Sequence, residues 1–170
     1  MSRLFLKTIR FDASDTFSFP FAAQPDEWAV SGAFAFADTE PGALTGKPRQ
    51  AFTNGLLGLT SFSHATFAAV ANATQTDISR ITDRLAHHFV ESYGAPGKEA
   101  ALPAARGEVE FIEDLIAGSL INTLFCVSRS FDVQDRIVER FRKLERRIDG
   151  GPIYLGGEQL PPAGSPSDGC

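Results

Sequence analysis

Apolar residues alternate with polar or small residues along several stretches of the chain, a pattern typical of β-strands. The clearest is WAVSGAFAFAD, in which residues 28–37 place large rings on one face and almost only small side chains on the other. Similar alternation predicts strands over residues 3–11, 16–21, 59–71 and 121–131. Both faces of the 28–37 stretch are apolar, so this predicted strand needs cover on two sides.

Helical periodicity follows in the second half of the chain. A stripe of Ile78, Ile81, Leu85 and Phe89 predicts a helix from Thr76, its N-cap, to Tyr93. The same spacing predicts helices over residues 103–117 and 132–148, and a shorter one over residues 47–57. The 132–148 stretch has the strongest helical pattern, and Asp132 with Asp135 resembles an acidic capping box at its start.

The order of these elements predicts an α+β fold. Three early strands separated by short turns favour an antiparallel sheet of about five strands, with three to four helices packed on one face. The periodic elements predict one domain over residues 1–149, followed by a Gly/Pro-rich tail over residues 150–170. Two interpretations of that tail stay open: it docks through Ile153, Tyr154 and Leu155, or it is disordered.

Composition narrows the classes of function. The chain has 15 Phe but only 2 Tyr and 1 Trp, which favours a packed apolar interior over a polar recognition surface. A net charge of −5 argues against nucleic acid and anionic membranes as partners. No signal peptide or run of about 20 apolar residues is present, and the two cysteines, Cys126 and Cys170, follow no motif. We therefore expect a cytoplasmic protein without membrane attachment.

His64 is the strongest candidate for chemistry. It shares a predicted strand face with Phe62, Thr66 and Val70, so it needs a hydrogen-bond partner or an opening onto a cleft. The simpler interpretation is that His64 is a buried structural histidine. In the catalytic interpretation, His64 is an acid or base assisted by Asp12, Asp15 or Arg49. The predicted ligand or interface residues are Trp28, Phe34, Phe36, Arg49 and His64.

Other motifs favour ordinary structural roles. GALTGKP, residues 42–48, is one residue too short for a phosphate-binding loop and has Pro48 in place of the required hydroxyl residue. His87 and His88 diverge by about 100° on a helix, so they do not bind one metal together. Glu110 with Glu113 or Asp114 is best interpreted as a solvated acidic face. We expect no metal site and no cofactor.

Residues 136–147 contain six basic and two acidic side chains, and on a helix they form a basic stripe. Its members are Arg136, Arg140, Lys143 and Arg147. A solvated helix face is the best explanation of this basic stripe, and a surface that binds an acidic protein partner is the second. Binding of nucleic acid is disfavoured, because no aromatic residue lies between the basic residues of the stripe.

Three stretches, TIRFDASDTFSFPFAAQPDEWAVSGAFAFAD, TGKPRQAFTNGLLGL and DVQDRIVERF, resemble a small bacterial family of unknown function found mainly in alphaproteobacteria. The resemblance covers about residues 5–148. Genes of that family often neighbour a biotin/lipoate-ligase-like gene and genes for maturation of molybdenum-dependent dehydrogenases. The resemblance implies an accessory role and supplies no catalytic residues.

Two hypotheses follow. The first is a non-enzymatic accessory or binding protein, a homo-oligomer or bound to a protein partner through an apolar sheet face, with a role in cofactor-enzyme maturation. The alternative is a small enzyme or small-molecule-binding protein with His64 in a pocket between sheet and helices.

Overall fold

The computed structural model describes residues 3–145 and 154–156. These residues form one antiparallel sheet with the strand order β4-β3-β2-β1-β5-β6-β7-β8. The strands are β1 (Arg3–Ile9), β2 (Trp28–Val30), β3 (Leu56–Gly58), β4 (His64–Ala65), β5 (Phe67–Ala73), β6 (Leu124–Phe131), β7 (Ile137–Glu145) and β8 (Tyr154–Gly156). The predicted α+β class with an antiparallel sheet is confirmed, but the described residues contain eight strands where about five were expected.

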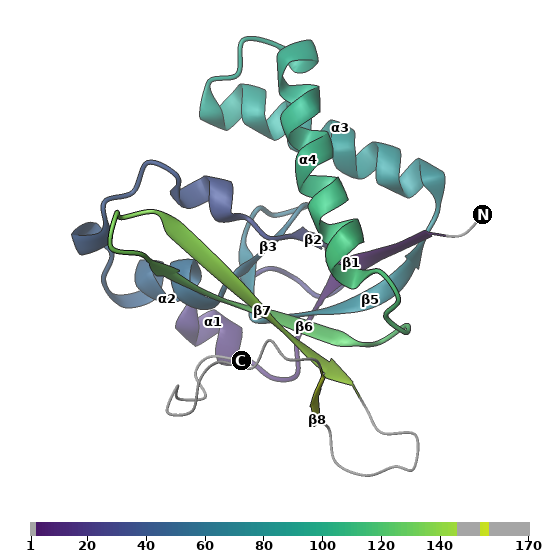
Figure 1. Cartoon of the computed structure of the whole chain (residues 1–170), viewed down its shortest axis with the longest axis horizontal. Coiled ribbons are helices and arrows are strands. Elements are labelled where there is room, and N and C mark those ends of the chain that lie inside the picture. The colour runs from purple at the N-terminus through teal and green to yellow at the C-terminus, as the bar shows by residue number, and fades with distance from the viewer. Residues whose placement is uncertain (1–2, 146–153, 157–170) are drawn as a thin grey trace.

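Four α-helices accompany the sheet: α1 (Ser14–Ser18), α2 (Gly46–Asn54), α3 (Gln75–Tyr93) and α4 (Lys98–Ile116). Figure 1 shows α3 and α4 packed side by side above the sheet, with α1 and α2 at its lower left. Thr74, not Thr76, caps α3, because its hydroxyl accepts from the Asp77 amide at 3.0 Å while the Asp77 carboxylate accepts from the Thr74 amide at 2.8 Å. Helix α4 starts five residues before the predicted Pro103, which lies on its exposed side.

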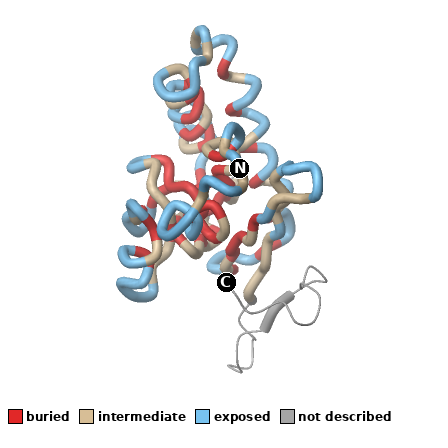
Figure 2. Tube along the Cα trace, turned by 90° about the vertical axis from the view of Figure 1, so that its left-hand side faces the viewer, coloured by how far each residue is buried: buried red, intermediate tan, exposed pale blue. Residues whose placement is uncertain are grey.

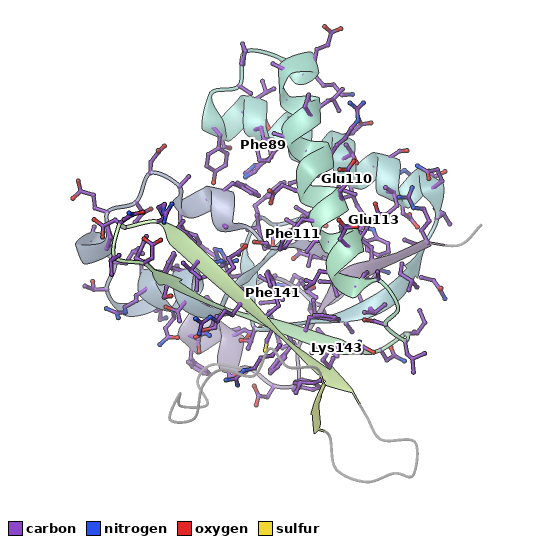
Figure 3. The ribbon with its side chains drawn as sticks, viewed as in Figure 1. Phe89, Glu110, Phe111, Glu113, Phe141 and Lys143 are labelled. Atoms are coloured by element: carbon purple, nitrogen blue, oxygen red, sulfur yellow. The ribbon has the colours of Figure 1, made fainter. Side chains whose placement is uncertain are left out.

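Helices α2 and α4 cover the same side of the β6–β7 hairpin. In its register Val127 lies opposite Phe141, Arg129 opposite Glu139 and Phe131 opposite Ile137, so these residues share one side. Phe131 stacks on Phe52 of α2, with ring centroids 4.5 Å apart. Phe141 meets Phe111 of α4 at 5.6 Å, and Figure 3 shows these two rings close together.

The predicted helix over residues 132–148 is wrong. Residues 137–145 form strand β7, and a tight turn precedes it. The Asp132 carboxylate accepts from the amides of Gln134 and Arg136 at 2.8 and 2.9 Å, and Asp135 has a positive φ of 61°. These bonds reverse the chain and return it alongside β6. Residues 146–148 of the predicted helix, and with them Arg147, lie outside the described residues.

The long predicted strand over residues 28–37 is also wrong. Strand β2 ends at Val30, and residues 33–36 form a 3-10 helix. Gly32 causes the break: its φ is 83°, and a Cβ there would lie 2.7 Å from the Cβ of Leu57. The continuous apolar strand face on which the interface hypothesis was based is therefore absent.

The predicted 59–71 strand is divided too. Residues 60–63 form a turn between β3 and β4, and β5 begins only at Phe67. Glu27 holds this turn, because its carboxylate accepts from the amides of Thr60 and Ser61 at 2.9 and 2.7 Å. The predicted 47–57 helix ends at Asn54, and its last two residues belong to β3.

The predicted strand over residues 16–21 is replaced by the short helix α1 and an irregular segment. The Asp12 carboxylate accepts from the Ser14 amide at 2.8 Å and the Thr16 hydroxyl donates to the Ala13 carbonyl at 2.6 Å, so local side chains form the turn. Residues 154–156 of the predicted tail pair with β7 as β8, with Leu155 opposite Leu144. The rest of that tail lies outside the described residues.

Buried residues gather where the sheet meets the helices, while the turn between α3 and α4 is exposed (Figure 2). The main apolar cluster joins β1, β5 and β6 to α3 and α4, with Phe5, Leu6, Leu85 and Ile112 fully buried. A smaller cluster holds Phe19, Phe36, Ala51 and Phe52. None of the described helices has the length and apolar character needed to span a bilayer.

Candidate functional site

His64 lies at the start of β4, in a tightly held stretch of backbone. Its amide donates to the Phe21 carbonyl at 3.0 Å, and its carbonyl accepts from the Ala23 amide at 2.8 Å. The imidazole lies between Phe19 and Phe36, with ring centroids 6.0 Å away on each side. Gly55 leaves room for it, because a Cβ at Gly55 would lie 2.8 Å from Cδ2 of His64.

The imidazole of His64 is neutral at pH 7. Burial, together with the nearby Arg129 charge, lowers the pKa of His64 to about 4. Its Nε2 atom is buried and makes no hydrogen bond in the structure. An acid or base needs a ring nitrogen within reach of a substrate, and Nε2 instead faces an apolar environment of phenylalanine rings.

The residues expected to assist His64 lie elsewhere. Asp15 is buried, but its carboxylate accepts from the Thr66 hydroxyl at 2.6 Å and from the Thr66 amide at 3.3 Å. Asp12 is exposed and its carboxylate accepts from the Ser14 amide, while Arg49 is exposed on α2. Among the described contacts, none joins His64 to these three residues, so the predicted catalytic group is not assembled around the imidazole.

Trp28 and Phe34 belong to other parts of the molecule. Trp28 meets Phe5 edge-on at 6.2 Å and lies 4.5 Å from the Lys7 ammonium. Phe34 meets Phe89 of α3 at 4.9 Å and Tyr93 at 5.5 Å. Only Phe36 lies beside His64, and the five predicted site residues therefore occupy four separate places.

Arg129 is the main polar residue of the interior, and sequence reasoning missed it. Its side chain is fully buried, and it donates to the carbonyls of Phe52 and Gly55 at 2.8 and 2.9 Å and to that of Ser31. It also pairs with the Glu139 carboxylate at 2.7 Å. Arg129 thus joins β6 to β2, to β7 and to the end of α2. The sequence signal for its burial was the alternation along β6, which places Arg129 on the same strand face as the apolar residues Phe125 and Val127.

A hydroxyl and one further carboxylate lie near this ion pair. The Ser31 hydroxyl donates to Glu139. Burial raises the pKa of Glu108 on α4, and the nearby Glu139 charge adds to the effect while Arg129 opposes it. Burial lowers the pKa of Arg129, and the Glu139 charge counteracts it. The Arg129 side chain is fully buried, that of Glu139 is 18% exposed, and their described partners belong to the protein itself, so the ion pair indicates a structural role.

The GALTGKP loop and the histidines of α3 have ordinary structural surroundings. The start of GALTGKP, Gly42 and Ala43, belongs to a 3-10 turn over residues 41–43. The hollow beside this turn is lined by the carboxylates of Asp38, Glu40 and Asp135, which repel phosphate. His87 lies 2.9 Å from Glu91 on the exposed side of α3, and His88 stacks on Phe62 with centroids 3.7 Å apart. Within residues 3–145 and 154–156, no three His, Cys, Asp or Glu side chains group in a way that fits a metal ion.

The predicted basic stripe is wrong because its residues lie on a strand and a turn. Lys143 and Arg140 point to opposite sides of β7, since residues at odd spacing alternate. Arg136 belongs to the turn and pairs with Asp132 at 3.0 Å. The described members of the predicted stripe, Arg136, Arg140 and Lys143, therefore form no continuous row along one face.

Three phenylalanine rings point into solvent from one segment, residues 11–21. Phe11, Phe17 and Phe21 are 64%, 74% and 75% exposed, while Phe19 between them is buried. A strand would have placed residues 17, 19 and 21 on one face. The end of α1 at Ser18 separates them instead. The sequence signal was the phenylalanine density of TFSFPF, which we interpreted as interior.

The backbone of this segment, which we name the aromatic segment, is fixed by polar contacts. The Arg10 guanidinium donates to the Ala23 carbonyl, Asp15 binds Thr66, and the Phe21 carbonyl accepts from the His64 amide. Phe19 anchors it to the small apolar cluster. The exposed rings are thus carried by a structured support, which is the arrangement of a preformed contact surface.

No curated protein and no solved structure matches the chain. A family profile does match, over residues 2–151, which is most of the chain. The chain therefore belongs to the family of unknown function DUF6505.

Proposed function

We propose that this chain is a non-enzymatic accessory protein that binds another protein through the aromatic segment, residues 11–21. The observation that carries the proposal is the exposure of Phe11, Phe17 and Phe21 on one fixed segment. Phenylalanine has no polar group that benefits from contact with water. Rings exposed to this degree on a structured support favour a partner that covers them.

The exposed area is large enough for a functional contact. Taking about 200 Å² for a fully exposed phenylalanine side chain, the three rings together expose roughly 400 Å². A single apolar patch of a few hundred Å² is often functional, and the proposal takes the three rings, which one segment carries, as parts of one contact. Aromatic side chains near the centre of an interface supply much of its binding energy. The proposed interface is therefore the aromatic segment, and no longer the sheet face over residues 28–37 that the sequence suggested.

The rival function, an enzyme centred on His64, is less well supported. It needs an open imidazole nitrogen, whereas Nε2 of His64 is buried against phenylalanine rings. It also needs an assisting group, and Asp15 is already bonded to Thr66. The finer role, help in the maturation of a cofactor-dependent enzyme in the cytoplasm, rests on the family resemblance and is part of the same proposal.

The test compares the 170-residue protein with a Phe17→Ser/Phe21→Ser variant. Polar replacement of exposed residues is expected to change the free energy of unfolding by about 0.5 kcal/mol or less. The matched control is Val133→Ser, because Val133 is equally apolar and fully exposed, but lies in the β6–β7 turn. Thermal unfolding by circular dichroism verifies that all three proteins fold.

Two measurements follow. Light scattering at micromolar concentration detects self-association, and quantitative co-purification from native cells detects other partners. We expect an assembly or a specific partner that the double variant loses at least tenfold and that Val133→Ser retains. A monomer whose co-purifying proteins are the same for all three variants would exclude the aromatic segment as an interface.

A further inference from the structure

The two long helices enclose a groove that the aromatic segment does not touch. It has a volume of about 380 Å³ and lies between α3 and α4, next to the start of β1. Cavities of about 300–1,000 Å³ are typical of small-molecule sites. Buried Ile78 and Val109 and half-buried Leu102 contribute apolar lining, while Ser79, Thr82 and Arg106 contribute polar lining. The groove is therefore suited to a ligand with one polar and one apolar end.

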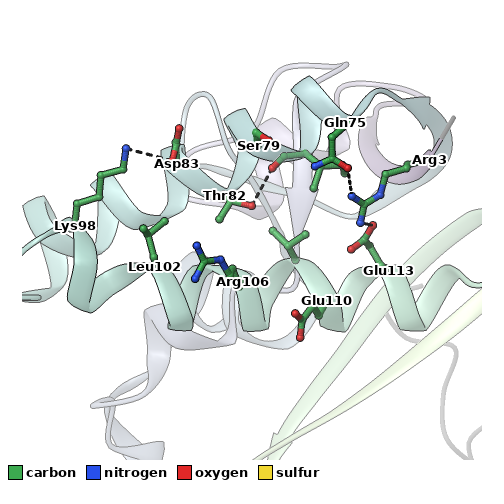
Figure 4. A pocket seen from close by; sticks show the side chains of 12 residues that line it. Arg3, Gln75, Ser79, Thr82, Asp83, Lys98, Leu102, Arg106, Glu110 and Glu113 are labelled. Atoms are coloured by element: carbon green, nitrogen blue, oxygen red, sulfur yellow. Dashed lines mark hydrogen bonds and ion pairs between the residues drawn. The ribbon is translucent and has the colours of Figure 1, made fainter. Parts of the chain in front are cut away.

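The charges at the two ends of the groove are paired within the protein. Lys98 lies 3.3 Å from the Asp83 carboxylate, and Arg3 binds both Glu113 and Gln75. Figure 4 shows these pairs at opposite ends of the groove, with Arg106 between them. The paired groups close the ends but present no net charge to a ligand.

Arg106 differs from the other cations of the groove. In the described part of the chain its guanidinium makes no hydrogen bond and no ion pair, although it lines the groove. In Figure 4 its side chain lies between the helices, below Thr82, whereas Glu110 one turn further on points away from α3. Arg106 is exposed beside the apolar lining and has no counter-charge among the described contacts, so its guanidinium is accessible to an anion from solution.

We propose that the α3–α4 groove binds a small monocarboxylic acid with an aliphatic body. Arg106 binds the carboxylate, the hydroxyls of Ser79 and Thr82 lie on the opposite wall, and Leu102, Ile78 and Val109 receive the apolar part. A dianion such as phosphate is disfavoured, because the Lys98–Asp83 and Arg3–Glu113 pairs leave Arg106 as the one cation of the described groove lining without a counter-charge, and Leu102, Ile78 and Val109 give a second negative charge no partner. This site is independent of the aromatic segment and of the proposed interface.

The test titrates the full-length protein, isotopically labelled, with straight-chain carboxylates from acetate to octanoate. Amide and arginine side-chain NMR signals report binding at the groove. Octanoate is expected to bind with a dissociation constant of about 0.1–1 mM, a range usual for a ligand of its size with one charged contact. Affinity should rise with chain length, and octanamide, octylamine and inorganic phosphate at equal concentration should bind at least tenfold more weakly.

Arg106→Gln removes the charge and keeps a neutral donor on a shorter side chain, and because Arg106 is exposed the variant should fold normally. It is expected to weaken octanoate binding at least tenfold. Arg49→Gln is the matched control, since Arg49 is exposed on α2 and does not line the groove. Thr82→Val, nearly equal in shape, should leave the affinity within about twofold, because the Thr82 hydroxyl already donates to the Ile78 carbonyl at 2.9 Å. Absence of saturable shifts at about 20 mM octanoate, or equal affinity of wild type and Arg106→Gln, would overturn the proposal.

Discussion

Arg129 allows the sharpest test of how this fold is held together. Replacing it with methionine keeps much of the side-chain volume but removes the charge and every donor. Glu139 then remains without its counter-charge, and the carbonyls of Ser31, Phe52 and Gly55 lose a donor. Because Arg129 is fully buried, solvent replaces these bonds poorly.

The magnitude follows from the two losses. Breaking a buried ion pair from one side costs about 3–5 kcal/mol. Each buried carbonyl left without a donor adds about 1 kcal/mol or more where water does not enter. Relaxation recovers part of this sum, so we expect Arg129→Met to lower the free energy of unfolding by about 4 kcal/mol. That is a large share of the roughly 5–15 kcal/mol typical of a domain.

Urea unfolding followed by the fluorescence of Trp28, the single tryptophan, measures this change. With a slope of about 2 kcal/mol per molar urea, the midpoint should fall by about 2 M. Arg140→Met is the matched control: Arg140 is exposed on the same hairpin, and its replacement should change stability by about 0.5 kcal/mol or less.

Two related variants separate charge from hydrogen bonding. Glu139→Gln keeps an acceptor for Arg129 and should cost about 2 kcal/mol, less than Arg129→Met. In Arg129→Met/Glu139→Leu the unpaired carboxylate is gone, so part of the lost stability should return. A midpoint shift below about 0.5 M for Arg129→Met would refute the reasoning, since a fully buried, multiply bonded cation does not leave the structure unchanged.

Two other predictions test the interior of the fold. The pKa of His64 is about 4 in the folded protein against 6.5 in the unfolded chain, so between those values the unfolded chain binds more protons and stability falls as the pH falls. The loss of unfolding free energy should reach about 3 kcal/mol near pH 4. In urea unfolding, His64→Leu should remove this part of the pH dependence, whereas the exposed control His87→Gln should keep it. An unchanged dependence of stability on pH in His64→Leu would contradict the burial of the imidazole. Gly32→Ala should lower the free energy of unfolding by about 2–3 kcal/mol, because the backbone there has a φ of 83° and the added Cβ would lie 2.7 Å from the Cβ of Leu57. The control Gly97→Ala has open space around the added Cβ and should change stability by about 1 kcal/mol or less. Equal urea midpoints for the two variants would show that the chain relaxes freely at Gly32.

The two long helices could be predicted because their signals are local. Thr74 with Asp77 supplies a capping box, and the apolar stripe of α3 recurs at helical spacing within the same segment. The turn that ends α3 has Gly94 in a left-handed conformation, as the sequence GAPG indicates. None of this depends on residues far away in the chain, so helix α3 was found, with its N-cap placed two residues too late.

The candidate site depended on contacts between distant residues, and for that reason it was not predicted. His64 is surrounded by Phe19, Phe36 and Gly55, which lie on three different elements. The exposure of Phe17 and Phe21 depends on where α1 ends and on the anchoring of Phe19. Alternation along TFSFPF reports only that one residue in two is aromatic. It carries no information on which ring is covered.

Strand β7 shows the limit most clearly, because its sequence satisfies two periodicities at once. Ile137, Phe141 and Leu144 recur at helical spacing, yet the observed strand pairs each of them with a residue of β6. The same Asp132 carboxylate that suggested a helix cap accepts from the two amides of a hairpin turn. Cap and turn use one chemistry, a carboxylate bonded to backbone amides two to four residues on. Contacts with distant residues favour the hairpin. A helix would leave the buried Arg129 without Glu139, whereas the hairpin brings the two charges into register together with the apolar pair Val127 and Phe141.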